Sequence, residues 1–345
     1  MLRWLVLLVL SVPAIAQAPS PVAGPTPAPT TSPSTSPTTA SDVPVGKAEL
    51  AVDTGPVRLQ VFTYRPANWS GQRLLFVMHG VLRNADEYRD HAVGMADRFD
   101  ALVVAPKFDS ERFPSRLYQR GGILREDGSA APPAEWTYAR IPELAAAVRA
   151  RTGKADAQLY VIGHSAGGQF VVRMSAFQDT GAVRLVAANP GSVLLPTTDV
   201  PFGYGFGGLP PELANDARLQ RYLAAPLTLY LGTGDDRDDE WFDKSKEAMA
   251  QGTGRHQRGL CLYWTARTLA AVRGWPFGWR LVEAPGVEHD HEKMFAHAMC
   301  EVALFGDAAA KPGTAKPEGA KPEATKKSDG AKPDGKPAEP AGGAR

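Results

Sequence analysis

The pattern of hydrophobic and polar positions changes along the chain. Residues 47–52 and 57–64 alternate between the two kinds on either side of Asp53-Thr54-Gly55. Because successive side chains of a strand point to opposite faces, this pattern predicts an antiparallel hairpin. Further on, short continuous apolar runs predict strands that are buried on both faces. These runs are residues 74–78, 102–105, 159–162, 185–188, 227–231 and 281–282.

Helix candidates lie between the apolar runs. They cover residues 85–98, 137–152, 166–178, about 256–273 and 291–305. In the third of them, Phe170, Met174 and Phe177 share one face. Alternation of strands and helices predicts an α/β fold with a mostly parallel sheet covered by helices. Four longer connections, 107–135, 190–225, 236–255 and 274–278, leave or approach the carboxyl ends of the strands, where such sheets bind ligands.

The amino-terminal segment has the pattern of a secretory signal. Arg3 precedes an apolar run over residues 4–12, and small residues follow at positions 14, 16 and 18. A retained membrane anchor is the less favoured alternative, because the run is shorter than the roughly 20 residues that span a bilayer. We therefore expect residues 1–18 to be a signal peptide and the protein to be exported, either periplasmic or secreted.

Two further segments lack the apolar residues that a folded core needs. Residues 19–44 are rich in proline, threonine and serine, and residues 308–345 are rich in lysine, proline and alanine. Both are predicted to be disordered, which leaves residues 45–307 as one catalytic domain. The tail contains eight basic and five acidic residues. It is either a weak electrostatic tether to an anionic envelope surface or a solubilising tail, and the acidic residues favour the second interpretation.

The charge balance argues against a nucleic-acid partner. The whole chain has 38 basic and 37 acidic residues, a formal net charge of +1. A surface that neutralises phosphates needs an excess of positive charge, and only the tail has one.

The strongest chemical signal is the sequence Gly163-His164-Ser165-Ala166-Gly167. It directly follows a predicted strand and directly precedes a predicted helix, the context in which a Gly-x-Ser-x-Gly motif exposes a nucleophilic serine on a tight turn. A glycine-rich loop that holds a phosphate is the alternative, but such loops contain a lysine or a different glycine spacing. The pattern therefore favours Ser165 as a nucleophile.

A serine nucleophile needs a histidine base and a carboxylate that orients the histidine ring. Asp235 follows the predicted strand 227–231 in Gly232-Thr233-Gly234-Asp235, and His289 follows the strand 281–282. His291 is the alternative base, less favoured because it begins the last predicted helix. A metal cluster of histidines and the acidic loop is a further alternative. It is disfavoured because we found no helix with ligands at i and i+4, so no metal or other cofactor is expected.

The tetrahedral intermediate of acyl transfer needs hydrogen-bond donors for its oxyanion. The backbone N–H of Ala166, which follows the nucleophile, is one candidate. The N–H of Val81 is the other, because Gly80 lets the chain turn at the end of the strand 74–78. The side chains of His79 and His164 are expected to be structural.

Together these motifs resemble those of the α/β-hydrolases. They are nearest to the esterase branch that contains polyhydroxybutyrate depolymerase-like and feruloyl-esterase-like proteins. The resemblance covers about residues 47–306. It implies an eight-stranded, mostly parallel sheet with an N-terminal antiparallel hairpin, no cofactor, and a Ser-His-Asp hydrolase.

The expected function is an exported serine hydrolase that cleaves a small-molecule or oligomeric carboxylic ester through an acyl-enzyme. The same groups also suit a peptidase or amidase, and a non-catalytic envelope-binding protein on this scaffold is a third alternative. Tyr118, Trp136 and Trp241 lie in or beside the long connections and are candidates for substrate binding.

The two cysteines, Cys261 and Cys300, leave two alternatives open. In an exported protein they are candidates for a disulfide, which would close a loop of about 40 residues and stabilise the fold by about 4 kcal/mol. Alternatively, each is a separately buried thiol. Export favours the disulfide.

Overall fold

The computed structural model describes residues 43–306. The predicted signal peptide, almost all of the predicted linker and the predicted tail lie outside the described residues. Val43, which was expected to belong to the linker, is buried in the core, and its carbonyl accepts a hydrogen bond from Arg65. Among the described helices, none has the length and apolar character to cross a membrane.

The described residues form an eight-stranded sheet in the order β1-β2-β4-β3-β5-β6-β7-β8. β1 and β2 form an antiparallel hairpin at the edge, β2 pairs antiparallel with β4, and the other neighbours are parallel. The expected fold class, including the N-terminal hairpin, is confirmed. The strands are β1 (Gly46–Thr54), β2 (Val57–Arg65), β3 (Arg73–Met78), β4 (Ala101–Lys107), β5 (Gln158–His164), β6 (Arg184–Ala188), β7 (Leu227–Gly232) and β8 (Arg280–Ala284).

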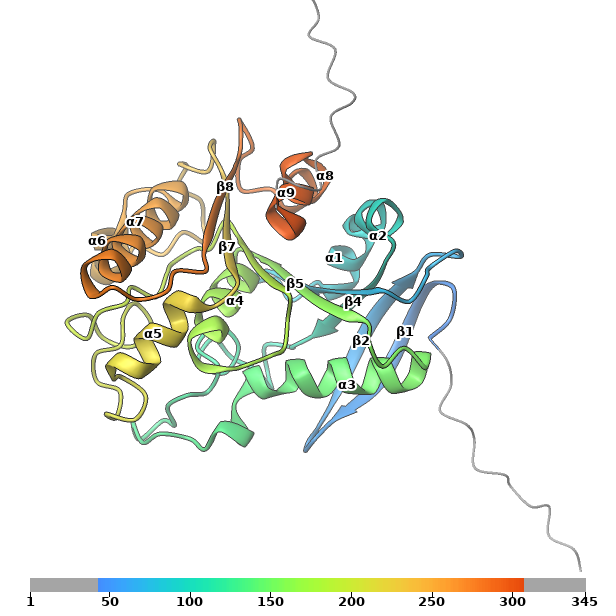
Figure 1. Cartoon of the computed structure of the whole chain (residues 1–345), viewed down its shortest axis with the longest axis horizontal. Helices are drawn as coiled ribbons and strands as arrows, with labels where there is room; N and C mark the ends of the chain where they lie inside the picture. Colours follow the sequence, from blue (N-terminus) through green and yellow to red (C-terminus); the bar gives the residue numbers. More distant parts are fainter. Residues whose placement is uncertain (1–42, 307–345) are drawn as a thin grey trace, which may run out of the picture. The chain divides into compact units, whose positions relative to one another are not determined.

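Helices cover both faces of this sheet (Figure 1). One face packs against α3, α4, α5 and α7, and the other against α1, α2, α8 and α9. The helices are α1 (Ala85–His91), α2 (Val93–Phe99), α3 (Arg140–Thr152), α4 (Ala166–Phe177), α5 (Asp216–Ala224), α6 (Lys246–Gln251), α7 (Arg255–Arg273), α8 (His291–Ala296) and α9 (Met299–Phe305). Two 3-10 turns, Pro133–Glu135 and Thr137–Ala139, precede α3.

The register of the parallel strands brings their carboxyl ends to one edge. Met78 of β3 pairs with Gly163 of β5, and Gly232 of β7 pairs with Ala284 of β8. The segments that follow these strands therefore lie side by side, although they are far apart in the sequence.

Two helix predictions were wrong in length. The predicted helix 85–98 is divided at Ala92, and the predicted helix 291–305 is divided at His297. His297 is extended, and its Nδ1 accepts a hydrogen bond from the backbone N–H of Met299, so the side chain satisfies a donor that a continuous helix would have satisfied.

Two short helices, α5 and α6, were not expected inside the long connections. Each begins at a side-chain cap: Asn215 accepts from the N–H of Arg218, and Ser245 accepts from the N–H of Ala248. These caps are a recognisable sequence signal for a helix start.

The expected disulfide is not formed in the structure. Cys261 and Cys300 are both free thiols. Cys261 lies on α7, whose buried residues pack on one face of the sheet, whereas Cys300 is buried in the core on the other face, with its Sγ 3.5 Å from the sulfur of Met95. Because the sheet separates the two helices, the thiols behave as the separate residues of the alternative interpretation.

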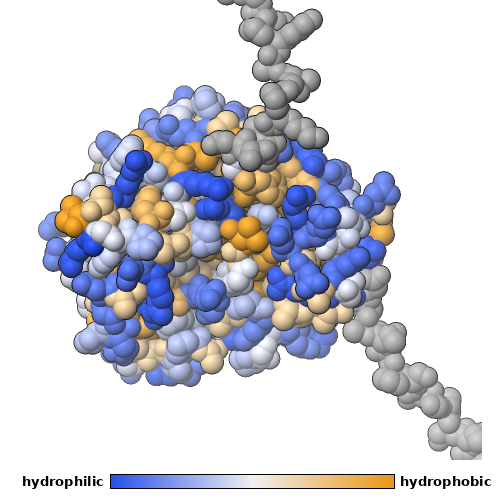
Figure 2. All heavy atoms as spheres, viewed as in Figure 1, coloured by the Kyte–Doolittle hydropathy of each residue, from blue (hydrophilic) through white to orange (hydrophobic). Residues whose placement is uncertain are grey.

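The visible face of the molecule is mostly hydrophilic, with hydrophobic residues in patches between the polar ones (Figure 2). Large apolar side chains that remain exposed include Leu82 and Trp241, which are 65% and 55% exposed. Both of these line the cavity described below.

Candidate active site

Ser165 lies on a sharp turn between β5 and α4. Its φ of 57° and ψ of −117° lie outside the regions that non-glycine residues usually adopt. The N–H of Ser165 is held by the carbonyl of Ala188 at the end of β6. The strand and the helix thus hold a strained serine at the carboxyl edge of the sheet.

Glycines allow the strand and the helix to approach each other at this turn. A Cβ on Gly163 would lie 2.3 Å from the carbonyl oxygen of Gly167, and a Cβ on Gly167 would lie 2.2 Å from the carbonyl oxygen of Met78. Atoms cannot approach so closely, so any larger residue at either position would displace the backbone. The two glycines of the Gly-x-Ser-x-Gly motif are therefore required for the packing of the helix on the strand, in addition to marking a serine nucleophile.

Asp235 and His289 come together from the segments after β7 and β8. His289 Nδ1 lies 2.7 Å from Asp235 Oδ2, and Asp235 is only 1% exposed. Because a carboxylate accepts, Nδ1 is the donor and carries the proton. The other ring nitrogen, Nε2, is then free to act as a base.

His291, the alternative base, has a different partner. Its Nε2 lies 2.8 Å from His91 Nδ1 on α1, and its ring stacks on Tyr88 with centroids 3.9 Å apart. Burial and the neighbouring His91 lower the pKa of His291 to about 4. Its ring therefore faces α1 and makes no hydrogen bond to Asp235.

Arg255 is a site residue that the sequence patterns did not reveal. It is 1% exposed at the first position of α7, and its guanidinium lies 3.4 Å from Asp235 Oδ1 and forms two 2.8 Å contacts with Asp239. The hydrogen bond from Arg255 lowers the pKa of Asp239. A signal existed, because an acidic loop after a strand needs a counter-charge and a cation in the first turn of a helix is otherwise unfavourable.

Asn189 is a second residue that sequence reasoning missed. It is fully buried after β6 with a φ of 42°. Its side-chain oxygen accepts from the N–H of Gly232, and its amide donates to the carbonyl of Glu288. Asn189 thus joins the segments that carry Asp235 and His289.

The turn after β3 lies beside Ser165. A Cβ on Gly80 would lie 3.9 Å from Ser165 Cβ, and Arg83 donates its N–H to the carbonyl of Gly80. No partner within residues 43–306 accepts the N–H of Val81. Ala166 is the first residue of α4, so its N–H also lacks a helical acceptor.

His79 holds this turn in place. The N–H of Phe108 donates to His79 Nε2 at 3.0 Å, so the ring proton is on Nδ1, 3.0 Å from the carbonyl oxygen of Gly80. Burial lowers the pKa of His79 to about 3 and keeps the ring neutral. His79 therefore has the structural role expected for it.

His164 packs behind the site. Its ring lies 4.5 Å from that of His289 between centroids, and its Nδ1 is 3.4 Å from the hydroxyl of Tyr88. Burial, together with His289, His291 and Arg255, holds the pKa of His164 well below its usual range. Within the described part of the chain, its buried Nε2 has no hydrogen-bond partner.

Ser165 and His289 both line a cavity of about 190 Å³. No hydrogen bond joins these two side chains in residues 43–306 as they stand. The apolar part of the lining comes from Val81, Leu82 and Trp241, so the structure places the expected Trp241 at the site.

Two of the three aromatic residues that were expected to bind substrate do not line this cavity. Tyr118 is fully buried, stacks on His79 and donates its hydroxyl to the carbonyl of His79. Trp136 is 2% exposed and donates its Nε1–H to the carbonyl of Ala131. Both are core residues with no surface left for a substrate, so this expectation was wrong for Tyr118 and Trp136.

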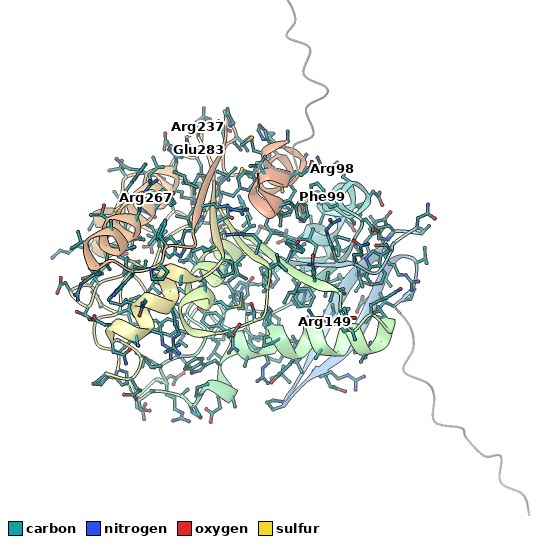
Figure 3. All side chains as sticks on the ribbon, viewed as in Figure 1. Arg98, Phe99, Arg149, Arg237, Arg267 and Glu283 are labelled. Carbon is teal, nitrogen blue, oxygen red and sulfur yellow. The ribbon has the colours of Figure 1, made fainter. Side chains whose placement is uncertain are left out.

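A larger open cavity of about 540 Å³ adjoins the first, and His289, His291 and Glu87 line both. Arg237, which lines the larger cavity, lies with Glu283 near the carboxyl ends of β7 and β8 in Figure 3. Carboxylates outnumber cations in this lining. The carboxylates are Glu87, Asp235, Asp238, Asp239, Glu288, Asp290 and Glu292, and the cations are Arg237 and Lys293.

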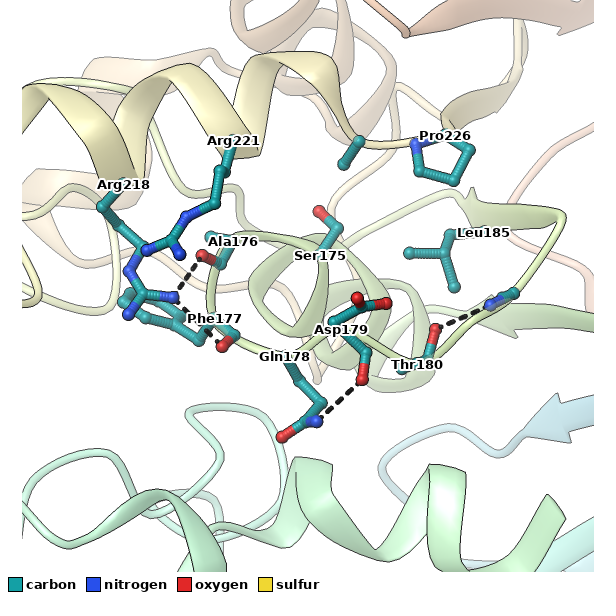
Figure 4. Close-up of a pocket in the computed structure, with 12 residues that line it drawn as sticks. Ser175, Ala176, Phe177, Gln178, Asp179, Thr180, Leu185, Arg218, Arg221 and Pro226 are labelled. Carbon is teal, nitrogen blue, oxygen red and sulfur yellow. Dashed lines mark hydrogen bonds between the residues drawn. The ribbon is translucent and has the colours of Figure 1, made fainter. Parts of the chain in front are cut away.

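A cavity of about 350 Å³ lies at the opposite edge of the sheet, at the carboxyl end of α4 (Figure 4). Arg218 reaches across it and donates to the carbonyls of Ala176 and Phe177, the last residues of that helix. The guanidinium therefore stabilises the helix end, and this cavity is remote from Ser165.

The expectation that no helix carries metal ligands at i and i+4 was wrong. Glu87 and His91 of α1 have this spacing, and a ring nitrogen of His291 lies with their ligand atoms inside a cluster whose members are all within 4.8 Å of one another.

Two solved structures of hydrolases are similar to this chain in sequence and in fold. Poly(aspartic acid) hydrolase-1 from Sphingomonas sp. KT-1 is 33% identical, and the match covers 75% of this chain and 98% of that chain with a TM-score of 0.71. LpqC, a poly(3-hydroxybutyrate) depolymerase from Bordetella parapertussis, is 34% identical over 73% of this chain and 87% of that chain, with a TM-score of 0.68. No protein-family model matches the chain, and no curated protein matches it either.

Proposed function

Because the chain belongs to the α/β-hydrolase superfamily, in the group that includes poly(3-hydroxybutyrate) depolymerase-like proteins, we propose that it is an exported serine hydrolase that cleaves carboxylic esters. The observation that carries the proposal is the constellation at the carboxyl edge of the sheet. Ser165 lies on a strained turn, in one cavity with a histidine whose Nδ1 is bonded to a buried carboxylate. The signal pattern of residues 1–18 supports export.

In the proposed reaction, Ser165 Oγ attacks the carbonyl carbon of the ester. His289 Nε2 takes the hydroxyl proton and then gives it to the leaving alcohol. Asp235 keeps the ring in the tautomer that leaves Nε2 free, and stabilises the imidazolium that forms. Water then attacks the acyl-enzyme with the same proton transfers, releasing the acid and restoring Ser165.

The proposed oxyanion hole consists of the N–H groups of Val81 and Ala166. Two observations support this assignment. Neither N–H group has an acceptor in the described residues, and the Gly80 turn lies beside Ser165. Donors that are already oriented stabilise the developing negative charge without reorganisation.

The lining of the site favours a neutral substrate with an apolar portion. Val81, Leu82 and Trp241 give an apolar side to the cavity at Ser165. The excess of carboxylates in the adjoining cavity would repel a polyanion. A short-chain or hydroxyalkanoate ester fits both features.

Cleavage of an amide is a second candidate, and the similarity to a poly(aspartic acid) hydrolase favours it. Poly(aspartic acid) is a polyamide, and a Ser-His-Asp site does not by itself choose between ester and amide. The acidic lining argues against poly(aspartic acid) itself as the substrate of this chain.

Two measurements test the proposal. A fluorophosphonate should label the wild-type protein and leave Ser165→Ala unlabelled. Hydrolysis rates over p-nitrophenyl esters, hydroxybutyrate oligomers, poly(aspartic acid) and peptide anilides then rank the substrate classes. We expect esters to be fastest, and Ser165→Ala to lower kcat about a thousandfold or more with an unchanged melting temperature.

Two results would refute the proposal. Failure of the fluorophosphonate to react would indicate a binding protein on a hydrolase scaffold. A kcat/KM for peptide anilides equal to or above that for the hydroxybutyrate oligomers, whose esters are not activated, would replace the esterase assignment with an amidase.

A further inference from the structure

Three potential metal ligands gather between α1 and α8, beside the site of Ser165. Glu87 and His91 are one helical turn apart on the same face of α1, and His291 is the first residue of α8. Their ligand atoms lie within 4.8 Å of one another. The proposed hydrolysis makes no use of this cluster.

The two histidines already present nitrogens to a common point. His91 Nδ1 and His291 Nε2 are 2.8 Å apart. In a tetrahedral zinc site with bonds of about 2.0 to 2.1 Å, two nitrogens are about 3.3 Å apart. A small rotation of either ring therefore makes room for an ion between the nitrogens, with the Glu87 carboxylate as the third ligand.

The surroundings of both rings suit ligation. If His91 binds an ion through Nδ1, its Nε2 lies 3.6 Å from the carboxylate of the exposed Glu292, and a small shift of that side chain would give the hydrogen bond that orients ligating histidines. His291 is fixed by stacking on Tyr88. The His291 ring would therefore lose little conformational freedom when the ion binds.

We propose that Glu87, His91 and His291 form a binding site for a divalent transition metal ion such as Zn²⁺. Two imidazole nitrogens and one carboxylate select Zn²⁺, Co²⁺, Ni²⁺ or Cu²⁺ over Mg²⁺ and Ca²⁺, which take oxygen ligands.

The proposed site leaves one coordination position facing solvent. All three ligands line the 540 Å³ cavity, and Glu87 and His291 also line the cavity of Ser165. Three protein ligands and one open position distinguish such a site from a closed structural zinc site. The ion would lie at the edge of the substrate cavity, where it offsets part of the excess negative charge.

The test is isothermal titration of the purified full chain with ZnCl₂ near neutral pH, after treatment with EDTA and without a polyhistidine tag. A Cys261→Ser background removes the half-buried thiol as a competing ligand. We expect one strong site per chain. Glu87→Gln and His91→Gln should each weaken it at least about tenfold, and MgCl₂ should not compete.

His256→Gln is the matched control. His256 also pairs with a carboxylate, Glu283 at 2.7 Å, but it belongs to no cluster of three ligands in the described part of the chain. Its loss should leave zinc binding unchanged. Glu87 is exposed, so Glu87→Gln should fold, and a metal-free melting curve verifies this.

Absence of a strong zinc site, or a site that survives both Glu87→Gln and His91→Gln unchanged, would overturn the proposal. Because binding is measured directly, the result does not depend on whether the chain is an esterase.

Discussion

At the scale of single residues, hydrogen bonds distinguish two histidines that the sequence places only two positions apart. His289 is hydrogen-bonded to Asp235, whereas His291 is hydrogen-bonded to His91 and its ring stacks on Tyr88. Both rings line the Ser165 cavity, but only the His289 ring has its other nitrogen held by the carboxylate, which fixes the tautomer that a general base needs.

We therefore expect His289→Ala to lower kcat for an ester by about a thousandfold, as much as loss of the nucleophile. His291→Ala should lower it by less than about tenfold. Steady-state kinetics with EDTA present check this, so that any bound metal does not contribute. The reverse order of the two variants would transfer the role of base to His291.

The positive charge of Arg255 compensates the negative charge of the buried Asp235. Removing the guanidinium leaves Asp235 and Asp239 without their cation in a site where Arg255 and Asp235 are both 1% exposed. We expect Arg255→Met to lower the free energy of unfolding by about 3 kcal/mol, measured by urea denaturation.

Arg237→Met is the control for this prediction. Arg237 pairs with Glu288 at 3.2 Å, but its side chain is 82% exposed. Solvent screens such a pair, so its loss should cost less than about 1 kcal/mol. Equal losses of unfolding free energy in the two variants would show that the buried ion pair contributes no more to stability than the exposed one.

At the scale of elements, the approach of α4 to β3 and β5 depends on glycine. A Cβ at position 167 would lie 2.2 Å from a backbone carbonyl oxygen, whereas a Cβ on Gly94 in α2 would meet nothing within 4 Å. The same substitution therefore has opposite consequences in two helices.

We expect Gly167→Ala to lower the free energy of unfolding by about 3 kcal/mol or more, because backbone must shift to admit the methyl group. Gly94→Ala should raise it by up to about 1 kcal/mol, because alanine has the higher helix propensity. Thermal or urea denaturation measures both. A Gly167→Ala protein as stable as the wild type would mean that α4 can withdraw from the sheet at little cost.

At the scale of the whole molecule, buried neutral histidines couple stability to pH. Burial, together with the smaller effects of the Arg83 and Lys107 charges, lowers the pKa of His79 from a usual 6.5 to about 3 in the folded chain. Below pH 6.5 the unfolded chain binds a proton that the folded chain excludes. The stability that neutral His79 contributes is therefore present above pH 6.5 and is lost as the pH falls toward 3.

We expect the free energy of unfolding to decrease between about pH 6 and pH 5, with His79 contributing about 1.4 kcal/mol per pH unit. His79→Gln should reduce that slope by about this amount, even if it lowers stability at every pH. Urea denaturation at several pH values gives the slope. A variant with the wild-type slope would mean that His79 is protonated equally in the folded and unfolded chains.

The sequence alone determined the layer structure and indicated which strand ends carry the candidate site residues. Eight strands were predicted because burial on one or both faces leaves a short-range period in the sequence, which needs no knowledge of distant residues. Ser165, Asp235 and His289 were predicted as the candidate site because each follows a strand, and the carboxyl ends of parallel strands meet at one edge. The glycines at positions 163 and 167 were found because the turn accepts no larger residue.

Only the tertiary structure decided which distant side chains meet. The pairing of Arg255 with Asp235, the bridge made by Asn189 and the turning of His291 toward α1 all join segments far apart in the sequence. The same is true of Cys261 and Cys300 on opposite faces of the sheet, and of the enclosure of Tyr118 and Trp136. The periodicity of apolar positions indicates whether a side chain is buried. Which side chains it contacts depends on how the helices cross the sheet, and a local sequence pattern contains no information about that.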